Sequence, residues 1–133
     1  MHITLPQGLS AYLQQLEQRT YAWFIAQDIN GTEEVFIRYY YEARRGSLKP
    51  LYAELMRHAG EQQIAVQPAI TDCLTRVVSD IVPASGRAIR LILGMLTYWL
   101  SQYHCGQHRE LPETREARDI IAGILHNQVI SVG

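Results

Sequence analysis

Lysine is nearly absent from this sequence of 133 residues, and neither sign of charge dominates it. Lys49 is the only lysine among the 12 basic residues, and the formal net charge is -1. A chain without a basic excess has no overall field that would recruit nucleic acid. We therefore expect no direct nucleic-acid binding by this chain. The preference for arginine is compatible with interface or anion contacts, although arginine usage also follows genome composition.

Cysteine is also scarce, since the sequence contains only Cys73 and Cys105. So few thiols are typical of a protein in a reduced compartment. No segment before the first amphipathic stretch resembles a signal peptide, which also indicates a cytoplasmic protein. Long apolar runs are missing too. The most apolar stretch is interrupted by Thr97 and Ser101 and is shorter than the roughly 20 residues that a membrane span needs. The sequence therefore predicts a cytoplasmic protein without a membrane span.

Recognisable catalytic motifs are absent as well. The chain has no glycine-rich phosphate loop, no nucleophile elbow and no pair of Glu-x-x-His motifs for a di-iron centre. His104 and His108 stand four residues apart, but Gly106 between them is expected to end the helix, which disfavours a shared metal ion. The sequence therefore predicts a protein that is not an enzyme and that holds no cofactor and no metal.

Helical periodicity and helix-ending residues run through the chain, whereas no segment has the pattern of a strand. Ser47 and Ser85 suit N-caps, and Pro68 is expected either to kink the fourth helix or to mark its true beginning. The expected helices run from near Pro6 to Asn30, Thr32 to Gly46, Ser47 to Gly60, Gln62 to Val82, Ser85 to Cys105 and about Pro112 to Val129. Residues 1–133 are thus predicted to form one all-α domain, a bundle of about six helices.

The segment from Arg87 to Tyr103 is too apolar around its circumference for a helix on the surface of a small monomer. One stripe suits the core of the chain itself, which leaves further apolar side chains on the other faces, namely Leu91, Met95, Tyr98 and Trp99. These need either a central position in the bundle or a second copy of the chain. Gly94 favours the second copy, because glycine within a helix costs roughly 1 kcal/mol relative to alanine and suits close approach of another backbone.

Aromatic residues fall on four of the predicted helices, which could converge. A bundle with several tyrosine hydroxyls near its centre can enclose an apolar cavity with a few polar anchors, although aromatic residues in bundles more often form plain core. Arg38, Glu42 and Arg76 are candidates for further polar contacts in such a cavity, and each also suits a solvated face. The sequence leaves both interpretations open.

The order of the elements resembles the C-terminal effector-binding and dimerisation domain of TetR-type transcriptional regulators. The resemblance covers most of the chain, from LSAYLQQLEQRTYAWFIAQ and FIRYYYEARRGSLKPLYAELMRH, through a kinked middle helix, to RAIRLILGMLTYWLSQY and EARDIIAGILHNQV. It implies that the last two long helices pair with their twofold mates, while the preceding helices surround a ligand cavity. The match is one of pattern and length. The N-terminal helix-turn-helix module of that family has no counterpart in this sequence, so DNA binding is not implied.

Two functional hypotheses follow. The first is a homodimeric ligand-binding or regulatory module, in which a small apolar or aromatic ligand favours one arrangement of the helices. Its ligand-binding residues would be Trp23, Tyr39, Tyr40, Leu55, Leu74 and Leu96. Its dimer interface, on the last two long helices, would include Arg90, Leu91, Met95, Tyr98, Ile121 and Leu125. The second hypothesis is a helical adaptor with a solid core and no small-molecule ligand, and a small enzyme ranks third.

Overall fold

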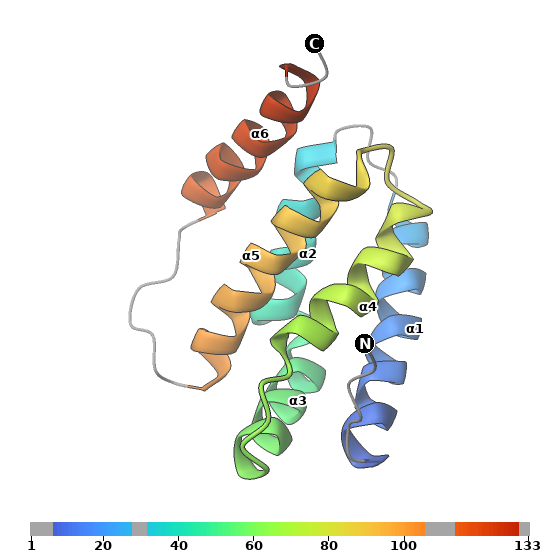
Figure 1. Cartoon of the computed structure of the whole chain (residues 1–133), viewed down its shortest axis with the longest axis vertical. Helices are drawn as coiled ribbons and strands as arrows, with labels where there is room; N and C mark the ends of the chain where they lie inside the picture. Colours follow the sequence, from blue (N-terminus) through green and yellow to red (C-terminus); the bar gives the residue numbers. More distant parts are fainter. Residues whose placement is uncertain (1–6, 28–31, 106–113, 131–133) are drawn as a thin grey trace.

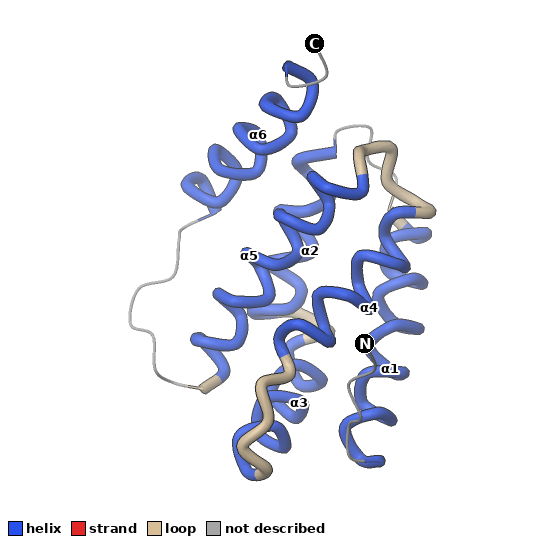
Figure 2. Tube along the Cα trace, viewed as in Figure 1, coloured by secondary structure: helices blue, strands red, loops and turns tan. Residues whose placement is uncertain are grey.

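The structure, a computed structural model, describes residues 7–27, 32–105 and 114–130, and these residues form an all-α bundle as predicted (Figure 2). The helices are α1 (Gln7–Ala26), α2 (Thr32–Arg45), α3 (Lys49–Glu61), α4 (Gln67–Ser79), α5 (Gly86–His104) and α6 (Thr114–Ile130). Strands are absent from these three stretches. None of the described helices has both the length and the hydropathy that a membrane crossing requires.

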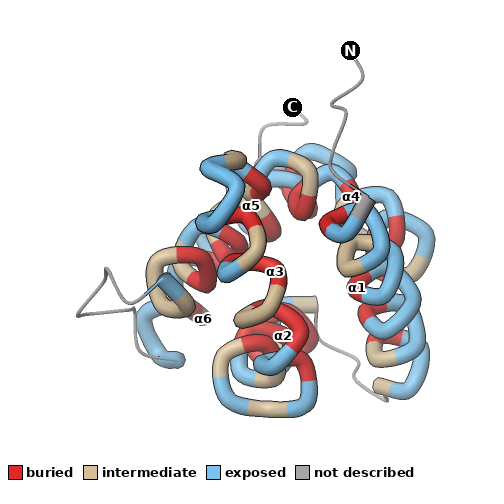
Figure 3. The backbone as a smooth tube through the Cα atoms, turned by 90° about the horizontal axis from the view of Figure 1, so that it is seen from below, coloured by how far each residue is buried: buried red, intermediate tan, exposed pale blue. Residues whose placement is uncertain are grey.

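The helices surround one core, with α6 at its edge. α4 lies between α1 and α5 and packs against both, while α2 lies behind α5 (Figure 1). α3 contacts α1, α2 and α5, and α6 packs against α2 and α5. Seen along the bundle, the buried positions of α1, α2, α4 and α5 face a common interior (Figure 3). The long helix α5 therefore touches four of the other five helices.

The core stripe of α2 shows why this segment is a helix. Phe36, Tyr39, Tyr40 and Ala43 recur at the spacing of one helix face, and the three aromatic members are among the largest fully buried side chains of the described residues. Glu33 and Glu34 lie in the first turn and Arg44 and Arg45 in the last, where each sign of charge complements the helix dipole. The buried residues of α2 are Val35, Phe36, Ile37, Tyr39, Tyr40 and Ala43.

Two of the predicted helix starts are confirmed and one is wrong. The Ser85 hydroxyl accepts a hydrogen bond from the Ala88 amide at 3.1 Å and caps α5, and Pro68 lies in the first turn of α4, so it marks a true beginning. Ser47 does not cap α3, which is preceded by Leu48 without a side-chain cap. The Ser47 hydroxyl instead donates to the Glu42 carboxylate at 2.7 Å, which closes the turn between α2 and α3.

The end of α3 lies slightly beyond the predicted stop at Gly60. Gln63 adopts a left-handed backbone conformation with φ of 56°. The Ile64 amide donates to the Ala59 carbonyl at 2.9 Å, and the Gln63 amide donates to the Gly60 carbonyl at 3.2 Å. This pair of bonds is a Schellman motif, which satisfies carbonyls that the helix end would otherwise leave unpaired.

Gly94 in α5 faces a side chain of α4 and not a second backbone within the chain. A Cβ atom at this position would lie 3.7 Å from Cγ2 of Thr71, and no other atom beyond its own stretch of helix comes within 4 Å. That distance is an ordinary van der Waals contact. The single chain therefore has room for alanine at position 94.

Replacing Gly94 with alanine is expected to raise the free energy of unfolding by about 0.5–1 kcal/mol, because alanine loses less backbone entropy in a helix interior. Urea denaturation followed by circular dichroism measures the change. Gly60→Ala is the control for a helical glycine outside α5, since Gly60 lies in the last turn of α3 and a Cβ there would meet open space. A loss of stability in Gly94→Ala alone would mean that a second backbone packs against α5 at this point.

Candidate functional site

Three side-chain hydroxyls from three helices meet in the core. The Tyr39 hydroxyl of α2 lies 3.0 Å from Oγ1 of Thr20 in α1 and 2.7 Å from the Tyr52 hydroxyl of α3. All three residues are fully buried. Each hydroxyl can donate one bond and accept another, so the two bonds give every member at least one partner within the core. It ties α1, α2 and α3 together at one point.

Burial also fixes the protonation of the two tyrosines. Loss of solvent raises the pKa of Tyr39 from 10.0 to about 12, against the lowering effect of its hydrogen bonds with Thr20 and Tyr52. Burial, and to a smaller extent the neighbouring Tyr39, raises the pKa of Tyr52 well above its usual value. Both phenols therefore stay protonated into the alkaline range and keep their hydrogen bonds there.

His104 lies beside this tyrosine chain at the end of α5. Its ring stacks on Tyr52 with centroids 6.2 Å apart, and its Nε2 atom lies 3.2 Å from the Ala43 carbonyl of α2. Burial lowers the pKa of His104, which favours the neutral ring at neutral pH. His108 lies outside the described residues. In the three described stretches, no group of three or more His, Cys, Asp or Glu side chains is placed to hold a metal ion.

The six residues expected to bind a ligand all belong to the core of the bundle or border it. Five of them are almost completely buried members of the core cluster, and Trp23 is partly buried and packs against it. The Trp23 ring contacts the Tyr39 ring at a centroid distance of 5.6 Å. The five buried members are Tyr39, Tyr40, Leu55, Leu74 and Leu96. Two pockets lie at the surface of this core, and Tyr40 lines one of them while Trp23 lines the other.

Both pockets open between α2 and α6, in a region that we call the α2–α6 seam. The first, which we call the basic pocket, has a volume of about 440 Å³ and is lined by Tyr40, Tyr41, Arg44, Arg45, Thr114 and Arg115. The second, which we call the mixed pocket, has a volume of about 560 Å³ and is lined by Trp23, Gln27, Glu34, Ile37, Arg38, Tyr41, Glu42, Thr114 and Arg118. Tyr41 and Thr114 line both, so the two pockets adjoin.

Charge is distributed differently in the two pockets. In the mixed pocket, Arg118 of α6 pairs with Glu34 of α2 at 2.9 Å, so the ion pair joins the two helices. Arg38 and Glu42, named above as candidates for polar contacts, also line it. Arg76, the third such candidate, lies 4.0 Å from Glu17 on the α1–α4 side and belongs to neither pocket.

Arg44 is held in the wall of the basic pocket by two aromatic rings. Its guanidinium carbon lies 5.9 Å from the centre of the Tyr40 ring and 5.5 Å from that of Tyr103. Burial raises the pKa of the Tyr40 hydroxyl, while the nearby Arg44 charge opposes that rise. The Nε–H group of Arg44 is buried and has no acceptor in the part of the chain that the structure describes.

The residues expected at a dimer interface divide between surface and core. Leu91 and Tyr98 are 50% and 54% exposed, and their spacing of seven residues puts them on one side of α5. Arg90 pairs with Asp72 of α4 at 2.6 Å. Ile121 has no exposed surface, because its side chain packs within the core of the single chain. The remaining two residues, Met95 and Leu125, are partly buried and border the core.

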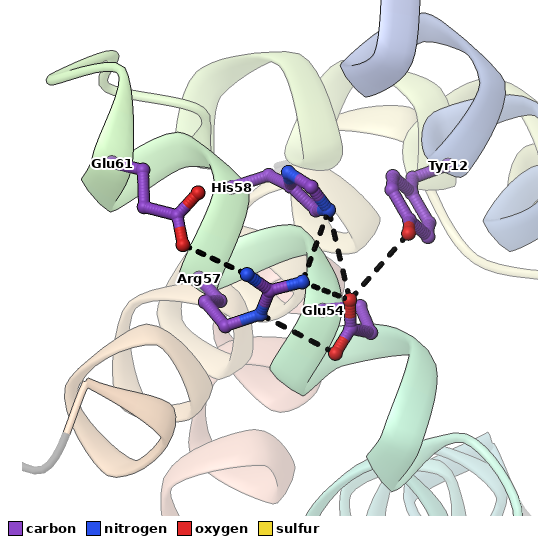
Figure 4. A network of polar contacts seen from close by, with 5 residues as sticks. All are labelled: Tyr12, Glu54, Arg57, His58 and Glu61. Carbon is purple, nitrogen blue, oxygen red and sulfur yellow. Dashed lines mark hydrogen bonds and ion pairs between the residues drawn. The ribbon is translucent and has the colours of Figure 1, made fainter.

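A polar network on the surface ties α1 to α3 (Figure 4). Arg57 lies 2.7 Å from Glu54 and 2.8 Å from Glu61, and His58 Nε2 lies 3.6 Å from the Glu54 carboxylate. The Tyr12 hydroxyl donates to Glu54 at 3.5 Å. Exposed ion pairs of this kind add little to stability, because water and salt screen their charges.

Tyr41, Arg45 and Arg115 line the basic pocket, but the sequence did not single them out. The sequence does contain one indication of a role for Arg115. It is the second residue of α6, where the helix dipole disfavours positive charge. The pairing of α2 with α6, which brings the arginines of the basic pocket together, has no signature in the hydrophobic periodicity of either segment.

Comparisons with family models, with curated proteins and with solved structures found no match to this chain.

Proposed function

We propose that this chain is a homodimeric helical ligand-binding and regulatory module whose ligand enters the α2–α6 seam. The observation that carries the proposal is the pair of adjoining pockets, with volumes of about 440 and 560 Å³. Small-molecule sites commonly measure about 300–1,000 Å³ and combine apolar walls with a few polar groups. Trp23 and Ile37 supply apolar wall in this seam, and arginine and glutamate side chains supply the polar groups.

The buried aromatic cluster supports the walls of the seam from beneath. Trp23 packs edge-on against Phe24 at a centroid distance of 5.0 Å, and Tyr40 packs against Trp99 of α5 at 5.7 Å. The rings that face the pockets are therefore held by the core, so little side-chain ordering is needed when a ligand binds. In this proposal Tyr39, Leu55, Leu74 and Leu96 shape the site through packing, whereas Trp23 and Tyr40 contact the ligand.

Regulation would act through the position of α6. A ligand in the seam contacts α2 on one side and α6 on the other, so its binding energy differs between arrangements of these two helices. Such a ligand shifts the population towards the arrangement that it fits best. The resemblance to the TetR effector domain, in which the last two helices form the dimer interface, supports a link between this movement and dimer assembly.

Leu91→Glu tests the dimer, because the native side chain is half exposed and its replacement leaves the core of the single chain intact. Size-exclusion chromatography with light scattering, at tens of micromolar protein, is expected to show a dimer for the parent chain and a monomer for the variant. The reason is that a carboxylate buried in an apolar interface without a partner costs several kcal/mol.

Ile25→Glu is the matched control, since Ile25 is 57% exposed on α1, away from α5. It is expected to leave the dimer unchanged. A parent chain that is monomeric at this concentration would contradict the dimer. It would favour an adaptor that uses the exposed Leu91 and Tyr98 side chains to dock a different protein.

A further inference from the structure

The basic pocket gathers three guanidinium groups, and the described residues place no carboxylate among them. Arg44, Arg45 and Arg115 line it, and the described lining residues include no aspartate or glutamate. No described carboxylate forms an ion pair with any of the three. Other arginines do face carboxylates within 4.0 Å, namely Arg57, Arg76, Arg90 and Arg118. The pocket is therefore a concentrated positive site on a chain whose formal net charge is -1.

The two helices contribute these charges under different electrostatic conditions. Arg44 and Arg45 lie in the last turn of α2, where the helix dipole favours positive charge. Arg115 lies in the first turn of α6, where the dipole disfavours it. Three like charges around one pocket repel one another, and this repulsion is relieved when an anion occupies the space between them.

Part of this site is fixed in advance. The Arg44 guanidinium packs on the rings of Tyr40 and Tyr103, so its position needs little ordering when a ligand binds. Tyr41 adds a half-exposed aromatic ring to the same pocket. Across from these α2 residues lies Arg115 of α6, so donors approach the space from two helices.

We infer that the basic pocket binds a small dianion of the phosphate-monoester class, which deepens the ligand-binding function proposed above and rests on it. A carboxylate offers two oxygens in one plane and a single charge. A phosphate monoester offers three terminal oxygens in different directions and about two charges, which suits guanidinium donors from two helices. The pocket volume of about 440 Å³ leaves room for an organic group beside the phosphate, against the Tyr41 ring.

Phenyl phosphate is the probe, titrated into the full chain at constant ionic strength. Two-dimensional NMR is expected to show shifts at the amides of Tyr40, Tyr41, Arg44, Arg45, Thr114 and Arg115. The variant Arg115→Gln is expected to weaken binding about tenfold, because it removes one charge-assisted contact. Arg45→Gln, on the opposite helix, is expected to weaken it similarly. Both positions are exposed, so the thermal midpoint of unfolding should stay close to that of the parent chain.

Arg87→Gln is the matched control, since Arg87 is exposed and is the second residue of α5, as Arg115 is of α6. It is expected to leave the affinity unchanged. Equal weakening in Arg87→Gln, or shifts spread over all arginines, would show unspecific charge attraction and overturn the inference. If indole shifts the amide signals of the seam residues and phenyl phosphate does not, the anion site is overturned while the proposed ligand-binding function is supported. If neither probe binds, both the anion site and the ligand-binding function are overturned. If a thymidine oligonucleotide binds more tightly than phenyl phosphate, and Arg115→Gln weakens its binding to the same extent, the small-molecule assignment is overturned.

Discussion

Replacing Tyr39 with phenylalanine is expected to lower the free energy of unfolding by about 2–4 kcal/mol, although the change removes a single oxygen. The Tyr39 hydroxyl is the middle member of the buried chain and bonds to both Thr20 and Tyr52. Its loss leaves two other buried hydroxyls each with one partner fewer. A buried polar group left unsatisfied costs about 1–3 kcal/mol, so the two losses together account for the size of the effect.

Tyr52→Phe is the matched comparison, because it removes an end of the chain and not the middle. Tyr39 keeps its bond to Thr20 in this variant, so we expect a smaller loss of about 1 kcal/mol. The double variant is expected to cost less than the sum of the two single changes, since it removes both partners of one bond. Urea denaturation of the four chains measures these terms. Equal and additive losses in the two single variants would contradict a central position for the Tyr39 hydroxyl.

The free energy of unfolding is also expected to fall steeply between pH 10 and pH 12. Burial raises the pKa of Tyr39 from 10.0 to about 12, so the unfolded chain ionises this tyrosine in a range where the folded chain keeps it protonated. The contribution is fully present below pH 10 and is lost as the pH rises through the folded pKa. A difference of this size corresponds to about 3 kcal/mol for Tyr39. The raised pKa of Tyr52 acts in the same direction.

Urea denaturation at a series of alkaline pH values measures this loss. Tyr39→Phe is expected to start from a lower stability and to lose less of it over the same range, because one of the two raised groups is gone. Tyr21→Phe is the control, since Tyr21 is 48% exposed and lies at the surface of the bundle. A pH dependence that is identical in the parent chain and in Tyr39→Phe would show that this phenol is not shielded from water.

The helices were predictable because their signals are local. The cap of α5 needs only Ser85 and the amide three residues later, and Pro68 acts on the backbone next to it. The cap expected at Ser47 failed because α3 begins one residue later than expected, after Leu48, while the Ser47 hydroxyl donates to Glu42 in the preceding helix. Where a helix begins within such a turn depends on the geometry of the turn, which the residue types alone do not reveal.

The site was predictable only in part, for a related reason. Periodicity identified the aromatic residues that converge, and the structure places Tyr39 and Tyr40 in the core. It could not show that α6 packs across α2, so the meeting of Arg45 with Arg115 was not foreseen. The same limit applies to Ile121, since an apolar stripe on a helix looks alike whether it faces its own core or a second chain.

The peripheral position of α6 has a consequence for the dynamics of the chain. Ala117 and Ile121 are its fully buried side chains among those described, and a half-exposed ion pair between Arg118 and Glu34 adds little to this contact. Amide hydrogens of α6 should therefore exchange with solvent through local openings, at a lower free energy than those around Tyr39. A compound that bridges the seam would slow that exchange selectively, so protection of α6 amides reports occupancy even for a ligand whose identity is unknown.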